Sequence, residues 1–126
     1  MDDRNLVAVA EQAAATSLVQ RGPLAGCTVL ADDGRHYRGC RLEFDDPADD
    51  LCPIVNAIAA SRVDGSRRIV RAGYYTPTSG QLPVFPAASI RVLEQVTNPD
   101  FVMIVSAGSG QFVEKTLAEL RQEASV

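Results

Sequence analysis

Residues 32–44 read Asp-Asp-Gly-Arg-His-Tyr-Arg-Gly-Cys-Arg-Leu-Glu-Phe, and this stretch decides the fold that we predict. The Asp-Asp-Gly triplet suits a tight turn, because aspartate and glycine tolerate the backbone angles of a hairpin. Strand-forming residues lie on both sides of it, at 26–30 and at 36–44. We therefore predict an antiparallel β-hairpin that turns at residues 32–34.

The segments around the hairpin alternate between helix and strand. A helix is predicted over 5–20, where apolar residues share one face and Arg21-Gly22-Pro23 ends the pattern. Downstream, the sequence predicts a loop at 45–50, a helix from Cys52 with Pro53 in its first turn, a strand at 69–75, a loop at 76–86, a helix at 87–96, a strand at 101–106, brief pairing at 111–113 and a closing helix at 116–123. This order is typical of a three-layer α/β/α fold, and we predict one domain over residues 1–126 with a mixed five-stranded sheet.

Composition excludes several classes of function. The 126 residues carry 12 basic and 16 acidic side chains, a net charge of about −4, without the basic stripe that nucleic-acid binding needs. No apolar run is long enough to cross a membrane, and no signal peptide is recognisable. The three cysteines, an odd number, favour free thiols. We expect a cytoplasmic protein that contacts neither nucleic acid nor membrane.

Several strings, in order and at matching spacing, resemble the small cytidine deaminase family. The strings are Asp33–Cys40, similar to the D-G-x-x-Y-x-G-C hairpin, followed by Glu43; Leu51–Ile58, similar to the helix that opens C-A-E-x-x-A-I; Pro86–Arg91, at the place of P-C-G-x-C-R; and Val113–Leu120, similar to the closing helix. The resemblance spans roughly residues 5 to 121. It implies the cytidine-deaminase-like fold and, by analogy, a homo-oligomer, either a dimer or a tetramer.

The family's chemistry requires three zinc ligands and a glutamate that moves protons. By this resemblance Cys52 occupies the first ligand position, whereas Ala87 and Ile90 occupy the other two and Ile54 replaces the glutamate. Methyl and branched alkyl groups cannot bind a cation. The sequence therefore predicts no zinc, no other cofactor and no cytidine deamination.

Cys52 is the candidate catalytic residue, as a nucleophile at a helix N-terminus, where the dipole favours a thiolate. The alternative is a small apolar residue left in the core. Arg41 and Glu43, two apart on a strand, either bind a polar ligand or form a surface pair. Arginine at the place of the family's asparagine suggests an anionic group such as a carboxylate or phosphate. The predicted substrate-binding residues are Arg41, Glu43, Phe44, Asn56, Phe85 and Arg91.

Three functions remain open. The first is a repurposed, zinc-independent enzyme that acts on a small polar metabolite or nucleoside-like compound through Cys52. The alternative is a non-catalytic binding or assembly protein that keeps the pocket. A true nucleoside deaminase is the least favoured. A basic cluster, Arg67, Arg68 and Arg71, is interpreted as solvated surface, with a phosphate or subunit contact as the alternative.

Overall fold

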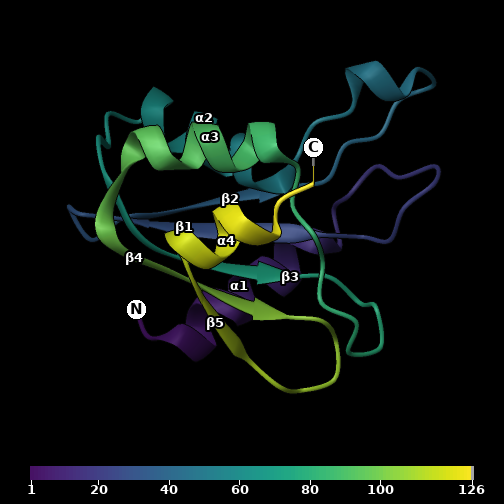
Figure 1. Cartoon of the computed structure of the whole chain (residues 1–126). Helices are drawn as coiled ribbons and strands as arrows, with labels where there is room; N and C mark the ends of the chain where they lie inside the picture. Colours follow the sequence, from purple (N-terminus) through teal and green to yellow (C-terminus); the bar gives the residue numbers. More distant parts are fainter. Residues whose placement is uncertain (126) are drawn as a thin grey trace.

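A computed structural model describes residues 1–125 and contains four α-helices, a short 3-10 helix and a five-stranded sheet (Figure 1). The elements are α1 (Asp3–Ala14), β1 (Gly26–Ala31), β2 (His36–Cys40), η1 (Pro47–Asp49), α2 (Pro53–Val63), β3 (Ile69–Tyr75), α3 (Ala87–Val96), β4 (Thr97–Ser106), β5 (Val113–Thr116) and α4 (Leu117–Glu123). The strand order is β2-β1-β3-β4-β5. Only β3 and β4 run parallel, so the sheet is mixed, as predicted.

The structure contains the predicted hairpin. Leu30 lies opposite His36 and Val29 opposite Tyr37, so Asp32–Arg35 make the turn. Gly39 then allows α2 to lie directly on β2: a Cβ at this position would lie 2.3 Å from the carbonyl oxygen of Pro53. A side chain here would push the helix off the sheet, so the glycine sets the distance between the two layers.

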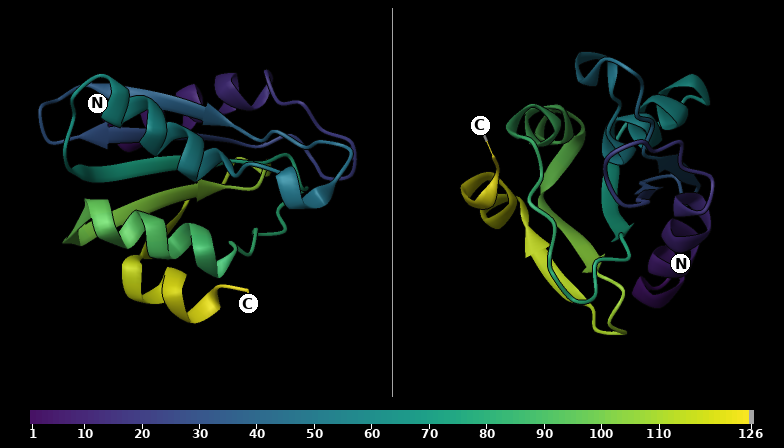
Figure 2. Two further views of the ribbon diagram at one scale, coloured as in Figure 1. Left: turned by 90° about the horizontal axis from the view of Figure 1, so that it is seen from above. Right: turned by 90° about the vertical axis from the view of Figure 1, so that its right-hand side faces the viewer.

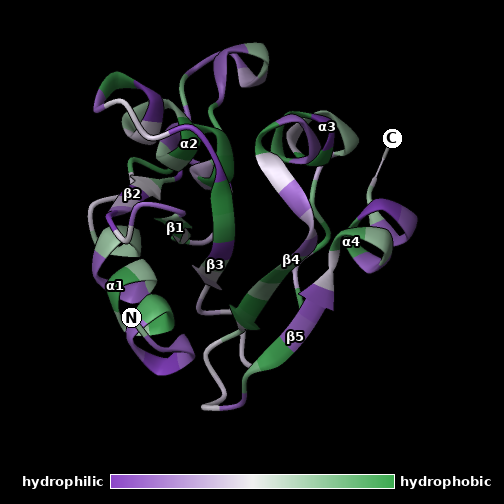
Figure 3. Cartoon of the chain, turned by 90° about the vertical axis from the view of Figure 1, so that its left-hand side faces the viewer, coloured by the Kyte–Doolittle hydropathy of each residue, from purple (hydrophilic) through white to green (hydrophobic). Residues whose placement is uncertain are grey.

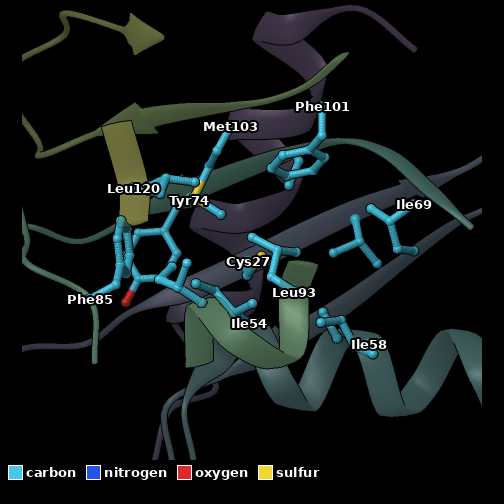
Figure 4. Packing of buried hydrophobic residues seen from close by; sticks show 14 of the residues in the cluster. Cys27, Ile54, Ile58, Ile69, Tyr74, Phe85, Leu93, Phe101, Met103 and Leu120 are labelled. Carbon is cyan, nitrogen blue, oxygen red and sulfur yellow. The ribbon is translucent and has the colours of Figure 1, made fainter. Parts of the chain in front are cut away.

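The helices cover both faces of the sheet (Figure 2). Helix α1 packs on one face, whereas α2, α3 and α4 lie over the other. The core between the sheet and α2–α4 combines residues of the strands with residues of these three helices; it includes Cys27, Ile54, Ile58, Tyr74, Leu93, Met103 and Leu120 (Figure 4). The hydropathy colouring shows the apolar side of the helices turned inward (Figure 3). None of the helices in residues 1–125 combines the length and the apolar character needed to cross a bilayer.

Four boundaries differ from the prediction. Helix α1 ends at Ala14, not at residue 20, because the chain turns there to reach the sheet edge. Strand β2 ends at Cys40, not at 44, because Leu42 leaves the ladder and forms isolated bridges with Leu18 and Leu51. Strand β4 begins at Thr97, four residues early, and the last short strand is 113–116 rather than 111–113.

Two arginines of the basic cluster are used inside the fold. Arg68 donates hydrogen bonds to the carbonyl oxygens of Gln95 and Thr97, at the end of α3. Arg71 donates to both carboxylate oxygens of Asp3 in α1. Both guanidinium groups therefore make intramolecular contacts at a half-buried part of the surface, and the Arg71 side chain is 32% exposed.

Candidate small-molecule site

A cavity of about 450 Å³ opens where α2 and α3 begin, beside the end of β3. Its polar lining consists of Arg41, Glu43, Asp50, Cys52 and Ser89. Its apolar lining includes Leu51, Val55, Tyr74, Val84, Phe85 and Val92. This size and mixture fit a small-molecule site, in which apolar walls hold a ligand and a few polar groups orient it.

Glu43 is buried and anchored by the segment that follows α1. Its Oε1 accepts three backbone N–H groups, from Gln20 at 2.7 Å, Arg21 at 2.8 Å and Gly22 at 3.0 Å. Hydrogen bonds to the charged form lower a carboxyl pKa, and these N–H groups, with those of Arg21 and Gly22 contributing most, lower the pKa of Glu43 to about 2. Glu43 is therefore ionised at neutral pH, with one oxygen fully used by the backbone.

Arg41 lies near Glu43 without pairing with it. Its Nη1 donates to the carbonyl oxygen of Pro23 at 3.3 Å, and no carboxylate among residues 1–125 forms an ion pair with its guanidinium. Gly22 leaves room for both groups, because a Cβ there would lie 2.6 Å from Arg41 Nη1 and 2.9 Å from Glu43 Oε2. Most of the five guanidinium donors are left for a ligand.

Cys52 occupies the N-cap position of α2 and lines the cavity, with Pro53 in the first helical turn, as predicted. Its side chain is half-buried and makes no capping hydrogen bond. Cys27 lies deeper in the core, where burial, reinforced by the nearby Cys52, strongly raises the pKa of its thiol. Of these two thiols, only Cys52 faces the cavity.

Tyr74 and Phe85 form the inner wall (Figure 4). Their ring centroids are 4.8 Å apart and their planes make an angle of 84°, the edge-to-face geometry that aromatic pairs favour. Burial raises the pKa of Tyr74, and the neighbouring Arg41 guanidinium opposes this rise. The hydroxyl therefore stays protonated and can donate to a ligand.

Three predicted binding residues lie outside the cavity lining. The Asn56 amide donates to the carbonyl oxygen of Cys40 at 2.8 Å, so it ties α2 to β2 and borders a second hollow of about 310 Å³. Arg91 lies on the exposed side of α3. Phe44 is 36% exposed, because the chain leaves the sheet after Cys40 and turns this ring outward. The structure therefore does not bring these three side chains into the lining of the cavity.

Three lining residues with polar side chains were not among the predicted site residues: Asp50, Tyr74 and Ser89. Tyr74, Tyr75 and Phe85 all flank the Pro-rich loop, and of these three aromatic residues only Phe85 is among the predicted site residues. Ser89 lies in the string that resembles the family's zinc-binding turn, and a polar residue in the first turn of a helix was the available signal. For Asp50, the sequence contains no indication of a binding role apart from its position in an acidic loop.

The donor set does not suit a zinc ion. Zinc sites in proteins use three or four thiolate, imidazole or carboxylate ligands around one point. Residues 1–125 contain no such cluster of three. At the start of α3, where the resemblance described above implies two further ligands beside Cys52, the chain has Ala87 and the buried Ile90. The side chains at these positions therefore cannot complete a tetrahedral site around zinc.

The structure superposes on solved cytidine deaminases. That of Burkholderia pseudomallei matches with a TM-score of 0.88 and 17% identity, over 99% of this chain and 100% of its own. That of Mycobacterium tuberculosis matches with 0.78 and 23%, over 98% and 97%, and that of Bacillus anthracis with 0.68 and 16%, over 95% and 86%. The chain has the cytidine deaminase fold. No protein-family model matches its sequence, and a comparison with curated proteins finds no relative.

Proposed function

We propose that this chain uses the cytidine deaminase fold to bind a small molecule, without zinc-dependent deamination. The observation that carries the proposal is the composition of the cavity, which keeps a polar corner of Arg41 and Glu43 and a thiol, Cys52, but offers one thiolate ligand and no proton-transfer group at position 54. A polar corner beside apolar walls serves recognition whether or not chemistry follows.

The lining carboxylates are poor general bases. An effective base has a pKa near the working pH. The backbone N–H groups lower the pKa of Glu43 to about 2, and the Arg21 side chain lowers the pKa of Asp50. His36, the single histidine, is exposed at the turn end of β2, four residues before its last residue, Cys40. These placements favour a binding protein over a catalyst.

A zinc-independent enzyme remains the second candidate, because Cys52 stands at a helix N-terminus inside the cavity. A nucleophilic Cys52 would be alkylated faster than Cys40, the other half-buried thiol. Its alkylation rate would rise with pH and show an inflection below pH 8, because the rate follows the fraction of thiolate. Slower alkylation of Cys52, with no inflection below pH 8, would leave the binding protein alone.

The exposed apolar residues at the cavity rim support an oligomer. Leu51 is 44% exposed and Val84 61%, and both line the opening. A second copy that covers this rim would remove apolar surface from water. Light scattering on the purified protein should give a dimer or tetramer, and a monomer at all concentrations would contradict this.

Three free cysteines also fit the reducing cytoplasm.

Three measurements test the main proposal. Elemental analysis of protein produced with added zinc should find far less than one zinc per chain, and cytidine should not be converted to uridine above a Cys52→Ala control. Native mass spectrometry should detect a small molecule retained by the wild type and by Val63→Trp, but not by Val92→Trp. Val92 lines the cavity whereas Val63 is 91% exposed, so the two variants add the same ring inside and outside the site. Stoichiometric zinc with cytidine turnover would overturn the proposal.

A further inference from the structure

Two helices begin at the same cavity, and neither has a side-chain cap. The N-cap residues, Cys52 for α2 and Pro86 for α3, make no capping hydrogen bond with their side chains. The N–H groups of Val55 and Ala88, both in cavity-lining residues, have no acceptor among residues 1–125. The first N–H groups of a helix need an acceptor, and the positive end of the helix dipole favours an anionic one.

Ser89 is a second, independent observation at the start of α3. The residue is only 5% exposed and lines the cavity, and its hydroxyl forms no hydrogen bond within residues 1–125. Its hydroxyl is accessible from the cavity, because Thr28 Oγ1 is the one fully buried side-chain oxygen or nitrogen without a partner in the described chain. A ligand oxygen near the start of α3 can therefore bond to Ser89.

The remaining donors come from the opposite wall. Arg41 has a guanidinium without a carboxylate partner in the described chain, and the protonated Tyr74 hydroxyl lies close to it. Donors from α2, α3, β3 and the segment after β2 therefore line one cavity. Of the acceptors in the same lining, Glu43 has one oxygen bonded to three N–H groups and Asp50 pairs with Arg21. These donors suit a ligand group that only accepts hydrogen bonds.

We infer that the cavity recognises a small apolar molecule through a single carboxylate, which bonds to Arg41, Ser89 and the uncapped start of α2 and α3. This inference rests on the proposed binding function and specifies its ligand class. A monoanion fits better than a phosphate dianion, because the ionised Glu43 and Asp50 line the same cavity and repel a second negative charge. The apolar body of the ligand packs against Val84, Phe85 and Val92.

Three probes of similar shape separate charge from hydrophobic binding: 3-phenylpropanoate, its neutral amide and phenyl phosphate. Isothermal titration at neutral pH should give measurable binding of the carboxylate, at least tenfold weaker binding of the amide, and weaker binding of the phosphate. Arg41→Gln should weaken carboxylate binding by about 10- to 100-fold, because a charge-assisted hydrogen bond is lost. Ser89→Ala should weaken it by about fivefold.

The controls keep the two proposals distinguishable. Arg91→Gln removes an arginine from the same helix but outside the cavity, and should leave binding unchanged. Val92→Trp should abolish binding of every probe, whereas Val63→Trp should not. Equal binding of amide and carboxylate, lost only in Val92→Trp, would overturn the carboxylate inference and leave the binding function standing. Tighter binding of phenyl phosphate would overturn the choice of a monoanion. No binding of any probe at about 10 mM, well above a weak Kd of about 1 mM, would overturn both.

Discussion

Replacing Glu43 by glutamine tests how strongly the 20–22 segment anchors the polar wall. The carboxylate Oε1 accepts three backbone N–H groups, and glutamine keeps an oxygen there while removing the charge. The pKa falls from an ordinary 4.5 to about 2, which corresponds to about 3 kcal/mol at about 1.36 kcal/mol per unit. Water in the cavity screens part of this electrostatic free energy. We therefore expect Glu43→Gln to lower the free energy of unfolding by about 1.5 kcal/mol and the Tm by about 6 °C.

The pH dependence identifies the cause of that loss. Because the folded pKa of Glu43 is depressed, its stabilisation is fully present above the unfolded value of 4.5 and disappears as the pH falls towards 2. The difference in unfolding free energy between wild type and Glu43→Gln should therefore shrink by more than half between pH 7 and pH 3.

Urea denaturation of both proteins at pH 7, 5, 4 and 3 measures this difference. Glu11→Gln is the matched control, because Glu11 is exposed on α1 and has no bonded partner for its side chain in the described chain. Its stability should follow the wild type within about 0.5 kcal/mol at every pH. A Glu43→Gln loss that is equal at pH 7 and pH 3, or no larger than that of the control, would refute the charge-anchor reasoning.

Three further substitutions or labels probe the layers around the site. Thr28→Val should stabilise the protein by up to about 1 kcal/mol in urea denaturation, because the buried Thr28 hydroxyl has no partner among residues 1–125; a loss of stability would show that it has one. Gly39→Ala should destabilise by about 3 kcal/mol, seen as a lower Tm, because its Cβ would meet the α2 backbone at 2.3–2.4 Å; an unchanged Tm would contradict that contact. Ellman's reagent at pH 8 should label Cys40 and Cys52 in the native state and Cys27 only after denaturation, since burial shields Cys27 and raises its pKa; native labelling of all three would disprove this.

Local sequence chemistry was sufficient for much of the fold. The Asp-Asp-Gly turn set the register of Leu30 opposite His36, and Pro53 after Cys52 marked the start of α2. These features depend on backbone preferences of neighbouring residues, which a sequence contains directly. The end of α1 was missed because the alanine-rich run favours a longer helix, while the bridge from Leu18 to Leu42 breaks it by a tertiary contact.

The site was predictable only in part. Arg41 and Glu43 do line one cavity, although the strand that was expected to place them on one face ends before both. Arg91 lies on the exposed side of α3, outside the cavity lining, because the face that a helix turns to the sheet depends on packing and not on the local string alone. The Glu43 anchor was invisible in the sequence, since its three donors are backbone N–H groups that any residue other than proline can supply.

The anchor of Glu43 also bears on the order in which the protein takes shape on the ribosome. Its three partners lie only 21–23 residues before it, so the loop that the hydrogen bonds close is short. This loop can close as soon as residue 43 has left the ribosome. The opposite wall, residues 83–92, emerges much later. A nascent chain can thus form the Glu43 anchor before the residues that close the other side of the cavity have been synthesised.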